Sequence, residues 1–428
     1  MSLAPNTLWR HTAGNKPEAE QLVSDLAADV AVIGGGFTGL STALHLARGG
    51  AKVVLLEAET LGWGASGRNA GFVVPNFSKA DPASVIKKLG QERGHRLLDV
   101  VGRGADRVFE IAAAAGMGRQ AEQNGWLQPA HTSEMVEVLQ RRVAAWQALG
   151  RPVEWLDAAE TARRTGMTRY KGALTDRSGG VINPLLYVFA LARLAQAAGA
   201  RLFENAPVSN VEADGAGWRV QSGSVTVRAH KVVLCTNGET RGVARKIGRA
   251  VVPLSVYQIA TKPLPADVVK RFSPGREPVG DTRNNLFTYR LDADNRLISG
   301  GMALVPIAAE ARMAKTIARR LANELSLGSV PEVEFSWRGT AAMTTDFLPH
   351  VYQFGPGFLG AVGCNGRGVA MTGMLGEVLA QAILQNQKPD DLPVPLASAF
   401  PIPFHLFARA APSVVLAQGM LSDRRTAV

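Results

Sequence analysis

The stretch Asp29-Val30-Ala31-Val32-Ile33-Gly34-Gly35-Gly36-Phe37-Thr38-Gly39 joins a short apolar run to a glycine-rich turn. A short apolar run that ends in glycines is typical of a buried parallel strand. A helical pattern follows at 38–48, and a second apolar run at 52–56 ends at Glu57. Because these segments have the order of one β-α-β unit, they predict an α/β fold.

The turn at 34–39 matches the pattern G-x-G-x-x-G, in which each glycine has a physical role. Gly34 allows the tight turn, Gly36 lets a pyrophosphate approach the backbone, and Gly39 lets helix and strand pack closely. Phosphates would meet free N–H groups at the positive end of the helix dipole. Glu57, at the tip of the second strand, can accept hydrogen bonds from a ribose. We therefore predict a dinucleotide site; the alternative is a glycine-rich turn of another α/β fold.

The same pattern occurs again at 355–360, which shows that the motif alone is weak evidence. Pro356 follows the first glycine there, and no strand-turn-helix order surrounds the match. We interpret this second match as a turn that enters a strand. The order of strand, turn, helix, strand and acid favours the first match.

Three further glycine-containing segments favour FAD over NAD. The loop 62–71 follows the second strand and offers backbone and side-chain donors to a long, extended cofactor. Segment 231–238 predicts a strand that ends in a small turn, and 363–370 predicts a turn that opens a late helix. That helix start could present its N–H dipoles to the electron-rich edge of a reduced flavin. Each segment alone is only a turn, but together and in this order they favour a flavin.

Composition and charge limit the class of protein. With 428 residues, 46% of them hydrophobic and 19% charged, the chain is expected to form two globular domains. Cys235 and Cys364 stand far apart, which argues against a disulfide or a zinc site and favours a reducing, cytoplasmic location. The apolar segment 28–47 contains too many glycines and polar residues for a membrane span, and no secretory signal is expected.

The net charge of +11 comes from lysines and arginines that are scattered along the chain. Because no basic run has the length of a nucleic-acid-binding tail, no nucleic-acid partner is expected. A solvated basic surface is the simpler interpretation. The alternative is a surface that attracts an anionic substrate or electron acceptor.

Neither an internal repeat nor a low-complexity linker is present, so we expect interleaved rather than serial domains. The patterns predict helices at 84–150 (interrupted at 125–129), at 184–199 and at 372–385, the last of them before a proline-rich tail. They predict strands at 200–203, 208–213, 251–262, 286–292 and 296–300, and a hairpin at 219–227.

The whole chain resembles the D-amino-acid oxidase superfamily of flavoproteins, in the branch near the gamma-glutamylputrescine oxidoreductases. The resemblance is carried by GGGFTG at 34–39, GASGRNAG at 64–71, TNG at 236–238, Trp337-Arg338-Gly339 with Asp346 and Pro349, and NGRG at 365–368. It implies oxidation of a C–N bond in a small-molecule amine or amino acid, such as a polyamine derivative or a secondary amino acid. The resulting imine would be hydrolysed.

The resemblance also implies the fold, which is α/β locally and α+β overall. A glutathione-reductase-like Rossmann FAD domain would be built from the separated segments 1–84, 155–248 and 335–428. An interleaved substrate domain with an antiparallel sheet would be built from 85–154 and 249–334.

The resemblance further implies which residues bind FAD. The first glycine turn and Glu57 are expected to bind the adenosine and pyrophosphate, and 66–71 is expected to follow the ribityl chain and ring. Val208 is expected to contact the adenine side, and 366–370 the pyrimidine edge. The residues expected to bind FAD are Gly34, Gly36, Phe37, Thr38, Gly39, Glu57, Ala58, Ala65, Ser66, Gly67, Arg68, Asn69, Ala70, Gly71, Val208, Thr236, Gly238, Gly366, Arg367, Gly368, Val369 and Ala370.

Two departures from the sarcosine-oxidase branch limit what the resemblance implies. That branch has a carboxylate-binding lysine after the late glycine turn, where this chain has Ala370. Tight recognition of sarcosine-like substrates is therefore not expected. That branch also links its flavin to a cysteine, but the matching stretch around Trp337 contains none. We therefore predict that FAD is bound non-covalently.

The residues that orient the substrate are the least defined. Tyr289 and Arg367 are the candidate catalytic residues, and Tyr257, Tyr289 and Trp337 are the candidate pocket residues. Because strand residues alternate between the two faces of a sheet, Tyr289 and Arg290 cannot both face the flavin, and Tyr289 is preferred. Arg367 could stabilise a reduced flavin or bind an acidic group of the substrate. No metal site is expected.

Three other functions stay open from the sequence. A flavin monooxygenase shares the first motif, whereas an NAD-dependent dehydrogenase would leave the loop 62–71 unexplained. A non-catalytic FAD-binding subunit, serving assembly or electron transfer, would hold a flavin that no amine reduces. The sequence does not decide whether oxygen or another acceptor reoxidises the flavin, nor does it decide the oligomeric state.

Overall fold

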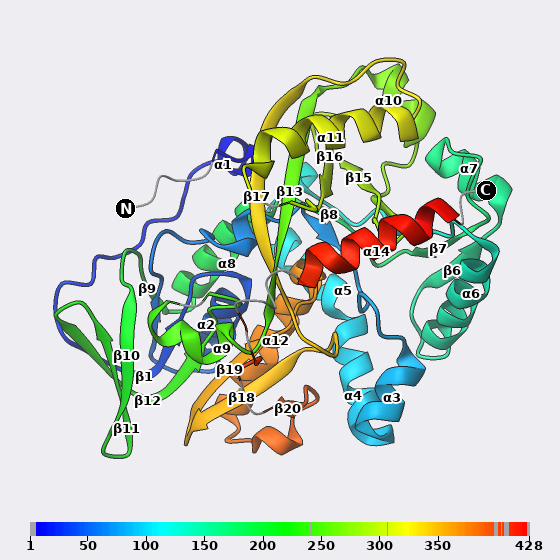
Figure 1. Cartoon of the computed structure of the whole chain (residues 1–428). Helices are drawn as coiled ribbons and strands as arrows, with labels where there is room; N and C mark the ends of the chain where they lie inside the picture. The colour runs from blue at the N-terminus through cyan, green and yellow to red at the C-terminus, as the bar shows by residue number, and fades with distance from the viewer. Residues whose placement is uncertain are drawn as a thin grey trace.

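The computed structural model describes residues 6–239, 241–305, 307–397, 401–403, 405 and 411–425. Two large sheets lie beside each other, with helices packed against both (Figure 1). The first sheet occupies the lower left of Figure 1, and the second occupies the top and the right.

The predicted β-α-β unit lies at the centre of a nine-stranded sheet. Its strands are β1 (Leu26–Ile33), β2 (Val53–Leu56), β9 (Arg201–Phe203), β10 (Val208–Asp214), β11 (Gly217–Ser222), β12 (Val225–Leu234), β18 (His350–Gly355), β19 (Phe358–Val362) and β20 (Leu396–Ala397). Their order is β20-β18-β19-β12-β1-β2-β9, and the hairpin β10–β11 is joined to β12. Strand β1 pairs in parallel with β2 and β12. These three strands carry long apolar runs because helices or loops cover both of their faces.

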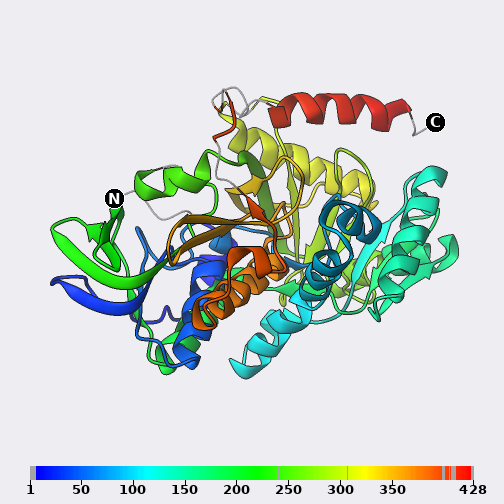
Figure 2. The same ribbon diagram turned by 90° about the horizontal axis from the view of Figure 1, so that it is seen from below.

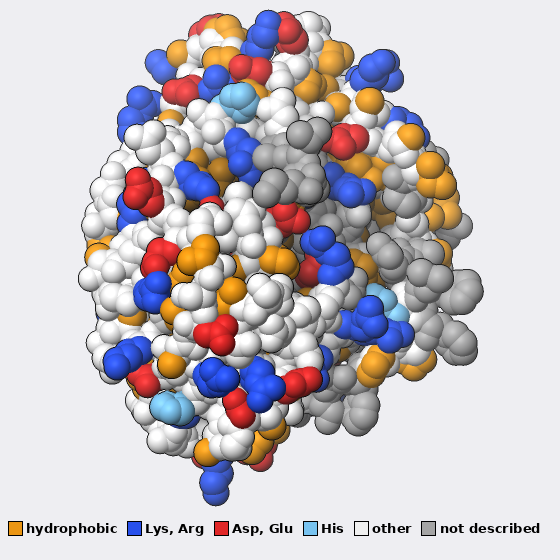
Figure 3. Space-filling model, turned by 90° about the vertical axis from the view of Figure 1, so that its left-hand side faces the viewer, with side chains coloured by type: hydrophobic (Ala, Val, Ile, Leu, Met, Phe, Trp, Pro, Cys, Tyr) orange, Lys and Arg blue, Asp and Glu red, His pale blue; other side chains and the backbone are white. Residues whose placement is uncertain are grey.

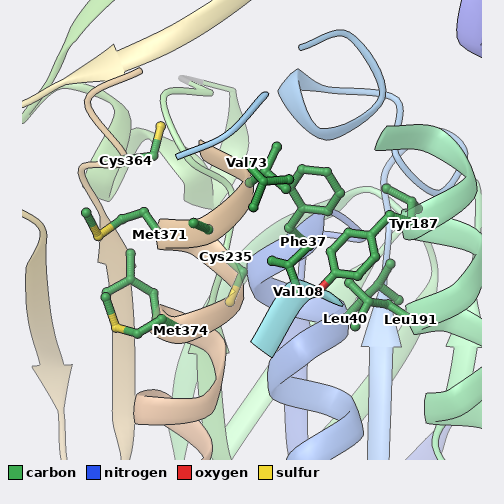
Figure 4. Packing of buried hydrophobic residues seen from close by; sticks show 14 of the residues in the cluster. Phe37, Leu40, Val73, Val108, Tyr187, Leu191, Cys235, Cys364, Met371 and Met374 are labelled. Carbon is green, nitrogen blue, oxygen red and sulfur yellow. The ribbon is translucent and has the colours of Figure 1, made fainter. Parts of the chain in front are cut away.

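Three helices pack beside this sheet and support the glycine turn. They are α2 (Phe37–Arg48), α8 (Pro184–Ala197) and α12 (Gly368–Leu384). Helices α2 and α12 approach closely, because a Cβ atom added at Gly376 would lie 2.6 Å from that of Ser41. The Ser41 hydroxyl donates to the carbonyl of Gly373 over 2.8 Å. On the other side the Phe37 ring faces Tyr187 of α8, with 5.4 Å between ring centroids (Figure 4).

The second sheet has eight strands in the order β17-β13-β16-β15-β14-β5-β7-β6. They are β5 (Trp126–Pro129), β6 (Val153–Leu156), β7 (Ala173–Asp176), β13 (Val252–Pro263), β14 (Val279–Gly280), β15 (Thr288–Leu291), β16 (Arg296–Gly301) and β17 (Val333–Met343). All neighbours are antiparallel except β14 and β5. Helix α11 (Ala309–Glu324) buries Met313, Ile317 and Leu321 against one face. The predicted antiparallel sheet is thus confirmed.

A small third sheet and the remaining helices connect these two layers. The small sheet has the strands β3 (Phe72–Val73), β8 (Gly180–Ile182) and β4 (Ala121–Glu122). The remaining helices are α1 (Leu8–Thr12), α3 (Pro82–Leu89), α4 (Gln91–Gly102), α5 (Gly104–Ala114), α6 (Ser133–Gln147), α7 (Ala158–Thr165), α9 (Arg245–Gly248), α10 (Ala266–Phe272) and α14 (Ala411–Arg425).

Local predictions differ from the structure in several ways, and one of them is α11, a helix that no pattern predicted. The break expected at 125–129 is strand β5, because β7 and β14 supply hydrogen-bonding partners that local sequence does not reveal. The helix expected at 372–385 begins at Gly368, and it is not the last one, since α14 follows the proline-rich segment. Figure 2 shows α14 along one edge of the molecule. By contrast, 355–360 is a turn that enters β19, as predicted.

The two sheets interleave along the chain, but not at the expected residues. Strand β7 belongs to the second sheet, although it lies inside the segment 155–248 expected for the FAD domain. Helices α4 and α5 contact α12, although 85–154 was expected in the substrate domain. The expected boundary at 154/155 therefore does not separate the two sheets.

Two further features concern the helices and the surface of the described chain. Among the described helices, none combines the length and the apolar character that crossing a membrane requires. On the face shown in Figure 3, basic and acidic side chains are interspersed rather than gathered into one basic field. That distribution favours the interpretation of the net charge as a solvated basic surface.

Candidate active site

A cleft of about 1650 Å³ lies between the two sheets. One wall is made by the loops that follow β1, β2, β12 and β19 at the carboxyl edge of the first sheet. The other wall is a face of the second sheet. Ligands of open α/β sheets bind at the carboxyl ends of the strands, so the predicted motifs and the cleft coincide.

The first glycine turn lies at the bottom of this cleft and needs its glycines for steric reasons. A Cβ atom at Gly39 would lie 1.9 Å from the carbonyl oxygen of Gly34, so no larger residue fits where α2 leaves the turn. Gly36 is the N-cap residue of α2, and the Ser66 hydroxyl accepts from the Phe37 N–H over 2.9 Å. The start of α2 therefore presents N–H groups and a positive dipole end to the cleft.

Glu57 follows β2 and lines the cleft beside this turn. Its carboxylate accepts from the backbone N–H groups of Gly35 (2.6 Å) and Glu59 (2.9 Å). Burial raises the pKa of Glu57 above its ordinary value, and the two backbone hydrogen bonds act in the opposite direction. Each oxygen keeps a second lone pair, so the carboxylate can still accept from a ribose hydroxyl.

The loop 64–71 forms the next part of the wall and is held from behind by three side chains. The indole N–H groups of Trp9 and Trp337 donate to the carbonyls of Asn69 (2.8 Å) and Arg68 (2.9 Å). The Arg290 guanidinium donates to the carbonyl of Gly71 over 2.9 Å. The loop carbonyls are thereby turned away from the cleft.

These three side chains also contact one another. The rings of Trp9 and Trp337 meet edge to face with centroids 5.9 Å apart, and Arg290 lies over the Trp9 ring at 5.3 Å. We call Trp9, Trp337 and Arg290 the aromatic clamp. Local sequence does not reveal this role, because the partners are backbone carbonyls on a distant loop.

The late turn closes the cleft on the α12 side. Asn365 adopts a left-handed conformation with φ of 49°, and its side-chain oxygen accepts from the Thr344 N–H over 2.8 Å. Arg367 is the N-cap residue of α12, and its guanidinium lies over the Trp126 ring at 5.4 Å. The predicted helix start at this turn therefore borders the cleft.

The second sheet contributes alternate residues to the opposite wall. Trp126 and Gln128 of β5, Gln258 of β13, Thr288 of β15 and Gly300 of β16 line the cleft. Successive side chains of a strand point to opposite faces, so the residues between them face the other way. The pocket face is therefore aromatic and amide-rich.

Tyr257 and Tyr289 are wrong as pocket candidates for this reason, whereas the third candidate, Trp337, is buried behind the loop 64–71. Tyr289 neighbours Thr288 and points into the core, where its hydroxyl donates to the Phe272 carbonyl over 3.2 Å. Tyr257 neighbours Gln258 and is likewise buried behind the sheet. Neither they nor Trp337 line the cleft. Arg290 instead shares the face of Thr288, where it belongs to the aromatic clamp.

Most of the expected FAD-binding residues do lie at the cleft. The structure places along it Gly34, Gly36, Phe37, Thr38, Glu57, Ala58, Ala65, Ser66, Arg68, Asn69, Ala70, Val208, Thr236, Gly238, Gly366, Arg367, Gly368 and Val369. Four expected residues, Gly39, Gly67, Gly71 and Ala370, pack behind the lining instead. For example, a Cβ atom at Gly71 would lie 2.1 Å from the Ile182 carbonyl oxygen, so this position is structural.

The shape of the cleft fits an extended dinucleotide, and so do the buried polar atoms along it that have no hydrogen-bond partner in the described chain. Arg68 Nε, Thr236 Oγ1 and Arg367 Nε are buried and have no hydrogen-bond partner among the described residues. Buried polar groups are normally satisfied, so these atoms await a ligand. They come from three separate loops, so the ligand must be long. Within the described residues, no cluster of acidic, histidine or cysteine side chains is placed to hold a metal ion.

A core of parallel strands with a glycine turn, an acidic residue and a long polar cleft is typical of dinucleotide-binding oxidoreductases. A family model described as FAD dependent oxidoreductase (DAO) matches residues 29–382. The chain therefore belongs to this family of FAD-dependent oxidoreductases, and FAD is its cofactor. The predicted family is confirmed, and the NAD-dependent alternative is excluded.

Curated relatives cover most of the chain. Gamma-glutamylputrescine oxidoreductase of Escherichia coli strain K12 is 29% identical over 368 residues, which are 85% of each chain. Probable oxidoreductase OrdL of Haemophilus influenzae is 28% identical over 366 residues, or 84% of each chain. Glycine oxidase of Geobacillus kaustophilus is 24% identical over 374 residues, 85% of this chain and 95% of the relative.

Solved structures show the same fold. The crystal structure of glycine oxidase from Geobacillus kaustophilus superposes with a TM-score of 0.69 at 22% identity, covering 85% of this chain and 96% of that chain. L-amino acid deaminase from Proteus vulgaris superposes with a TM-score of 0.72 at 19% identity, covering 88% and 95%. The predicted Rossmann FAD domain with an interleaved second sheet is thus confirmed.

Proposed function

We propose that this enzyme oxidises a C–N bond of an amine or amino acid, with FAD lying in the cleft between the two sheets. The observation that best supports this proposal is the cleft itself. Unpaired polar atoms from three loops line it, opposite a face of the second sheet. The names of the relatives support the substrate class, since they include a putrescine derivative and glycine.

The first sheet would hold the cofactor by the residues that line its side of the cleft. The start of α2 binds the pyrophosphate through N–H groups, and Glu57 accepts from the ribose. The loop 64–71, kept in place by the aromatic clamp, follows the ribityl chain and the ring. When bound, FAD accepts two electrons as a hydride from the carbon that bears nitrogen.

The second sheet would orient the substrate against that cofactor. Gln258 and Thr288 offer polar groups, and Gln258 Oε1 has no hydrogen-bond partner among the described residues. An oxygen of this kind can accept a hydrogen bond from an N–H group of the substrate amine. An amine that enters neutral needs no protein base, so orientation is the main contribution of this wall.

The proposed oxidation needs no acidic or basic side chain of the protein to account for its protons and electrons. The substrate carbon gives up a hydride and the nitrogen gives up a proton, which leaves an imine. Water then converts the imine into a carbonyl compound and releases ammonia or an amine. Oxygen or another acceptor takes the two electrons from the reduced cofactor in the second half of the cycle.

Anaerobic bleaching of the bound flavin tests this proposal. The substrate panel contains gamma-glutamylputrescine, free polyamines, D- and L-amino acids, sarcosine and opines, and the long-wavelength flavin absorbance is followed. We expect one chemical group to bleach the flavin, and readmission of air then separates an oxidase from a dehydrogenase. No bleaching by any member in flavin-loaded protein would instead favour a monooxygenase or a non-catalytic FAD-binding role.

A further inference from the structure

The loop that joins β14 to β15 forms part of the rim of the cleft on the side of the second sheet. Every residue from 281 to 286 lines the cleft. Within this loop, the buried carboxylate of Asp281 accepts from the backbone N–H groups of Arg283 (3.2 Å) and Phe287 (3.0 Å). The base of the loop is therefore fixed by the loop's own residues.

The tip of this loop consists of Asn284, Asn285 and Leu286, and its partners come from two helices. The guanidinium of Arg320 in α11 donates to the carbonyls of Asn285 (2.6 Å) and Leu286 (3.0 Å). The carboxylate of Asp423 in α14 accepts from the backbone N–H groups of Asn284 (3.0 Å) and Asn285 (2.8 Å). It also accepts from the side-chain amide of Asn284 over 3.1 Å. Side chains of opposite charge thus bind the carbonyl and the N–H groups of the loop tip.

Helix α14 packs closely against the loop tip with one face only. A Cβ atom added at Gly419 would lie 2.6 Å from that of Asn284, and Leu416 is buried on the same face as Gly419 and Asp423. Other large apolar side chains of α14 are more than half exposed, namely Val414, Val415 and Leu421. Both ribbon views show α14 as an outlying helix (Figures 1 and 2). Because apolar packing of α14 is limited, the hydrogen bonds of Asp423 are an important part of its attachment.

The chain also meets the cleft before α14 begins. His405 lines the cleft, and its ring donates to the carbonyl of Val251 over 2.8 Å. The N–H of Ile402 donates to the carbonyl of Arg249 over 2.9 Å. Both carbonyls directly precede β13, whereas Asp423 binds the loop between β14 and β15. His405 and Asp423 therefore contact the rim of the cleft at two separate places.

We propose that α14 borders the entrance to the cleft and limits the size of the molecules that reach the flavin. Asp423 is then a positioning residue, because it does not line the cleft and acts through the loop tip. For substrates, this inference rests on the proposed function; for access to the flavin, it rests on the cofactor alone. Because α14 lies outside residues 29–382, the match to the family model does not describe this entrance.

Two neutral oxidants of different size test the entrance without an amine. The FAD-loaded enzyme is reduced by light without oxygen and then mixed with p-benzoquinone or with the larger menadione. Reoxidation is followed by the long-wavelength flavin absorbance. Neutral oxidants are used because the loss of a charge in a variant does not alter their attraction. In Asp423→Ala, which loses three hydrogen bonds, we expect menadione to gain about tenfold in rate relative to p-benzoquinone.

Three further variants separate positioning from folding. Asp423→Asn keeps an acceptor oxygen and should recover part of the wild-type size selectivity. Gly419→Ala places a methyl group against Asn284 and should act like Asp423→Ala, although no charge is lost. Gln418→Ala is the matched control, because Gln418 neighbours Gly419 on the same helix but is exposed. It should leave the ratio of the two rates unchanged. All four variants should keep the wild-type affinity for FAD.

Amines that bleach the flavin extend the test to substrates. We compare a small active amine with a bulkier N-substituted form, in wild type and in Asp423→Ala. The wider entrance should lower the Kd of the bulkier amine, whereas the limiting rate of bleaching by the small amine should stay unchanged. This split is expected because the loop tip affects entry and not the geometry at the reacting carbon.

Three outcomes would overturn this inference. They are an unchanged ratio of quinone rates in Asp423→Ala, an equal change in Gln418→Ala, and a loss of FAD affinity in Asp423→Ala that parallels the change in the ratio. Failure of the proposed function would be distinguishable from these results. A changed quinone ratio without bleaching by any amine would count against the oxidation alone, whereas bleaching with an unchanged ratio would count against the entrance alone.

Discussion

At Gly39 the absence of a side chain is what allows α2 to start against β1. A methyl group there would lie 1.9 Å from the Gly34 carbonyl oxygen, and backbone cannot move out of its way as a flexible side chain can. We expect Gly39→Ala to lower the free energy of unfolding by about 1–3 kcal/mol, as overpacking does. It should also weaken FAD binding by at least about tenfold, since displaced N–H groups lose the pyrophosphate. Urea unfolding and flavin fluorescence titration measure both.

Gly373 is the matched control for this prediction. It lies within α12, and the nearest atom to an added Cβ is the Tyr187 hydroxyl at 3.8 Å, an ordinary contact. Gly373→Ala should therefore leave both quantities unchanged or raise stability slightly, because alanine is the better helix former. Equal effects of the two substitutions would contradict the steric role of Gly39.

The two cysteines bear on how the cofactor is attached. Cys235 and Cys364 both line the cleft, but both are buried, and burial raises the pKa of each thiol. A thiol held in the neutral form is a poor nucleophile. We predict non-covalent FAD, so acid precipitation should release the yellow colour into the supernatant. Yellow colour retained in the washed pellet would refute this prediction.

At the scale of elements, the short helix α1 supports the loop 64–71, although α1 lies outside the residues 29–382 that the family model matches. It places the buried Trp9 so that its indole N–H holds the Asn69 carbonyl over 2.8 Å. Trp9→Phe keeps the aromatic packing but removes this donor. The loop would then lose one anchor, and we expect the Kd for FAD to rise by about tenfold, in line with one buried hydrogen bond.

Trp218 provides the control at this scale. Its indole N–H also donates to a carbonyl, that of Pro356 over 3.0 Å, but it lies on the hairpin strand β11 and does not line the cleft. Trp218→Phe should therefore leave FAD affinity unchanged, as measured by equilibrium titration of apoprotein. If both variants lost affinity equally, the aromatic clamp would have no specific role.

At the scale of the whole molecule, the two sheets are joined by interleaved chain segments, and FAD would contact loops and sheet faces of both. A ligand that binds only the folded state stabilises it by mass action, about 2.7 kcal/mol at one hundred times the Kd. We therefore expect saturating FAD to raise a single thermal unfolding midpoint, seen alike by circular dichroism and by flavin fluorescence. Two transitions, with only the earlier one shifted by FAD, would show that the sheets unfold independently.

Local patterns predicted the parts of this site that depend on neighbouring residues. The glycine turn at 34–39, Glu57 and the late turn before α12 were all assigned from sequence, and all border the cleft. Their positions follow from the β-α-β order, which places the carboxyl ends of parallel strands at one edge. Local sequence does not specify which of the two faces of a strand lines the cleft. Tyr289 was consequently chosen, although Thr288 faces the cleft.

The amino-acid sequence by itself determined the glycine turn of the β-α-β unit, because glycine spacing acts within a few residues. Through its motifs and their resemblance to known flavoproteins it also determined the family, and that resemblance implied the interleaved antiparallel sheet. Only the tertiary structure decided that Trp9 and Arg290 anchor the loop 64–71 and that Arg367 lies over the Trp126 ring. These residues stand far apart along the chain, and nothing in their local sequence specifies which side chains meet. Packing of the two sheets brings them together, and the aromatic clamp exists only as a result of that packing.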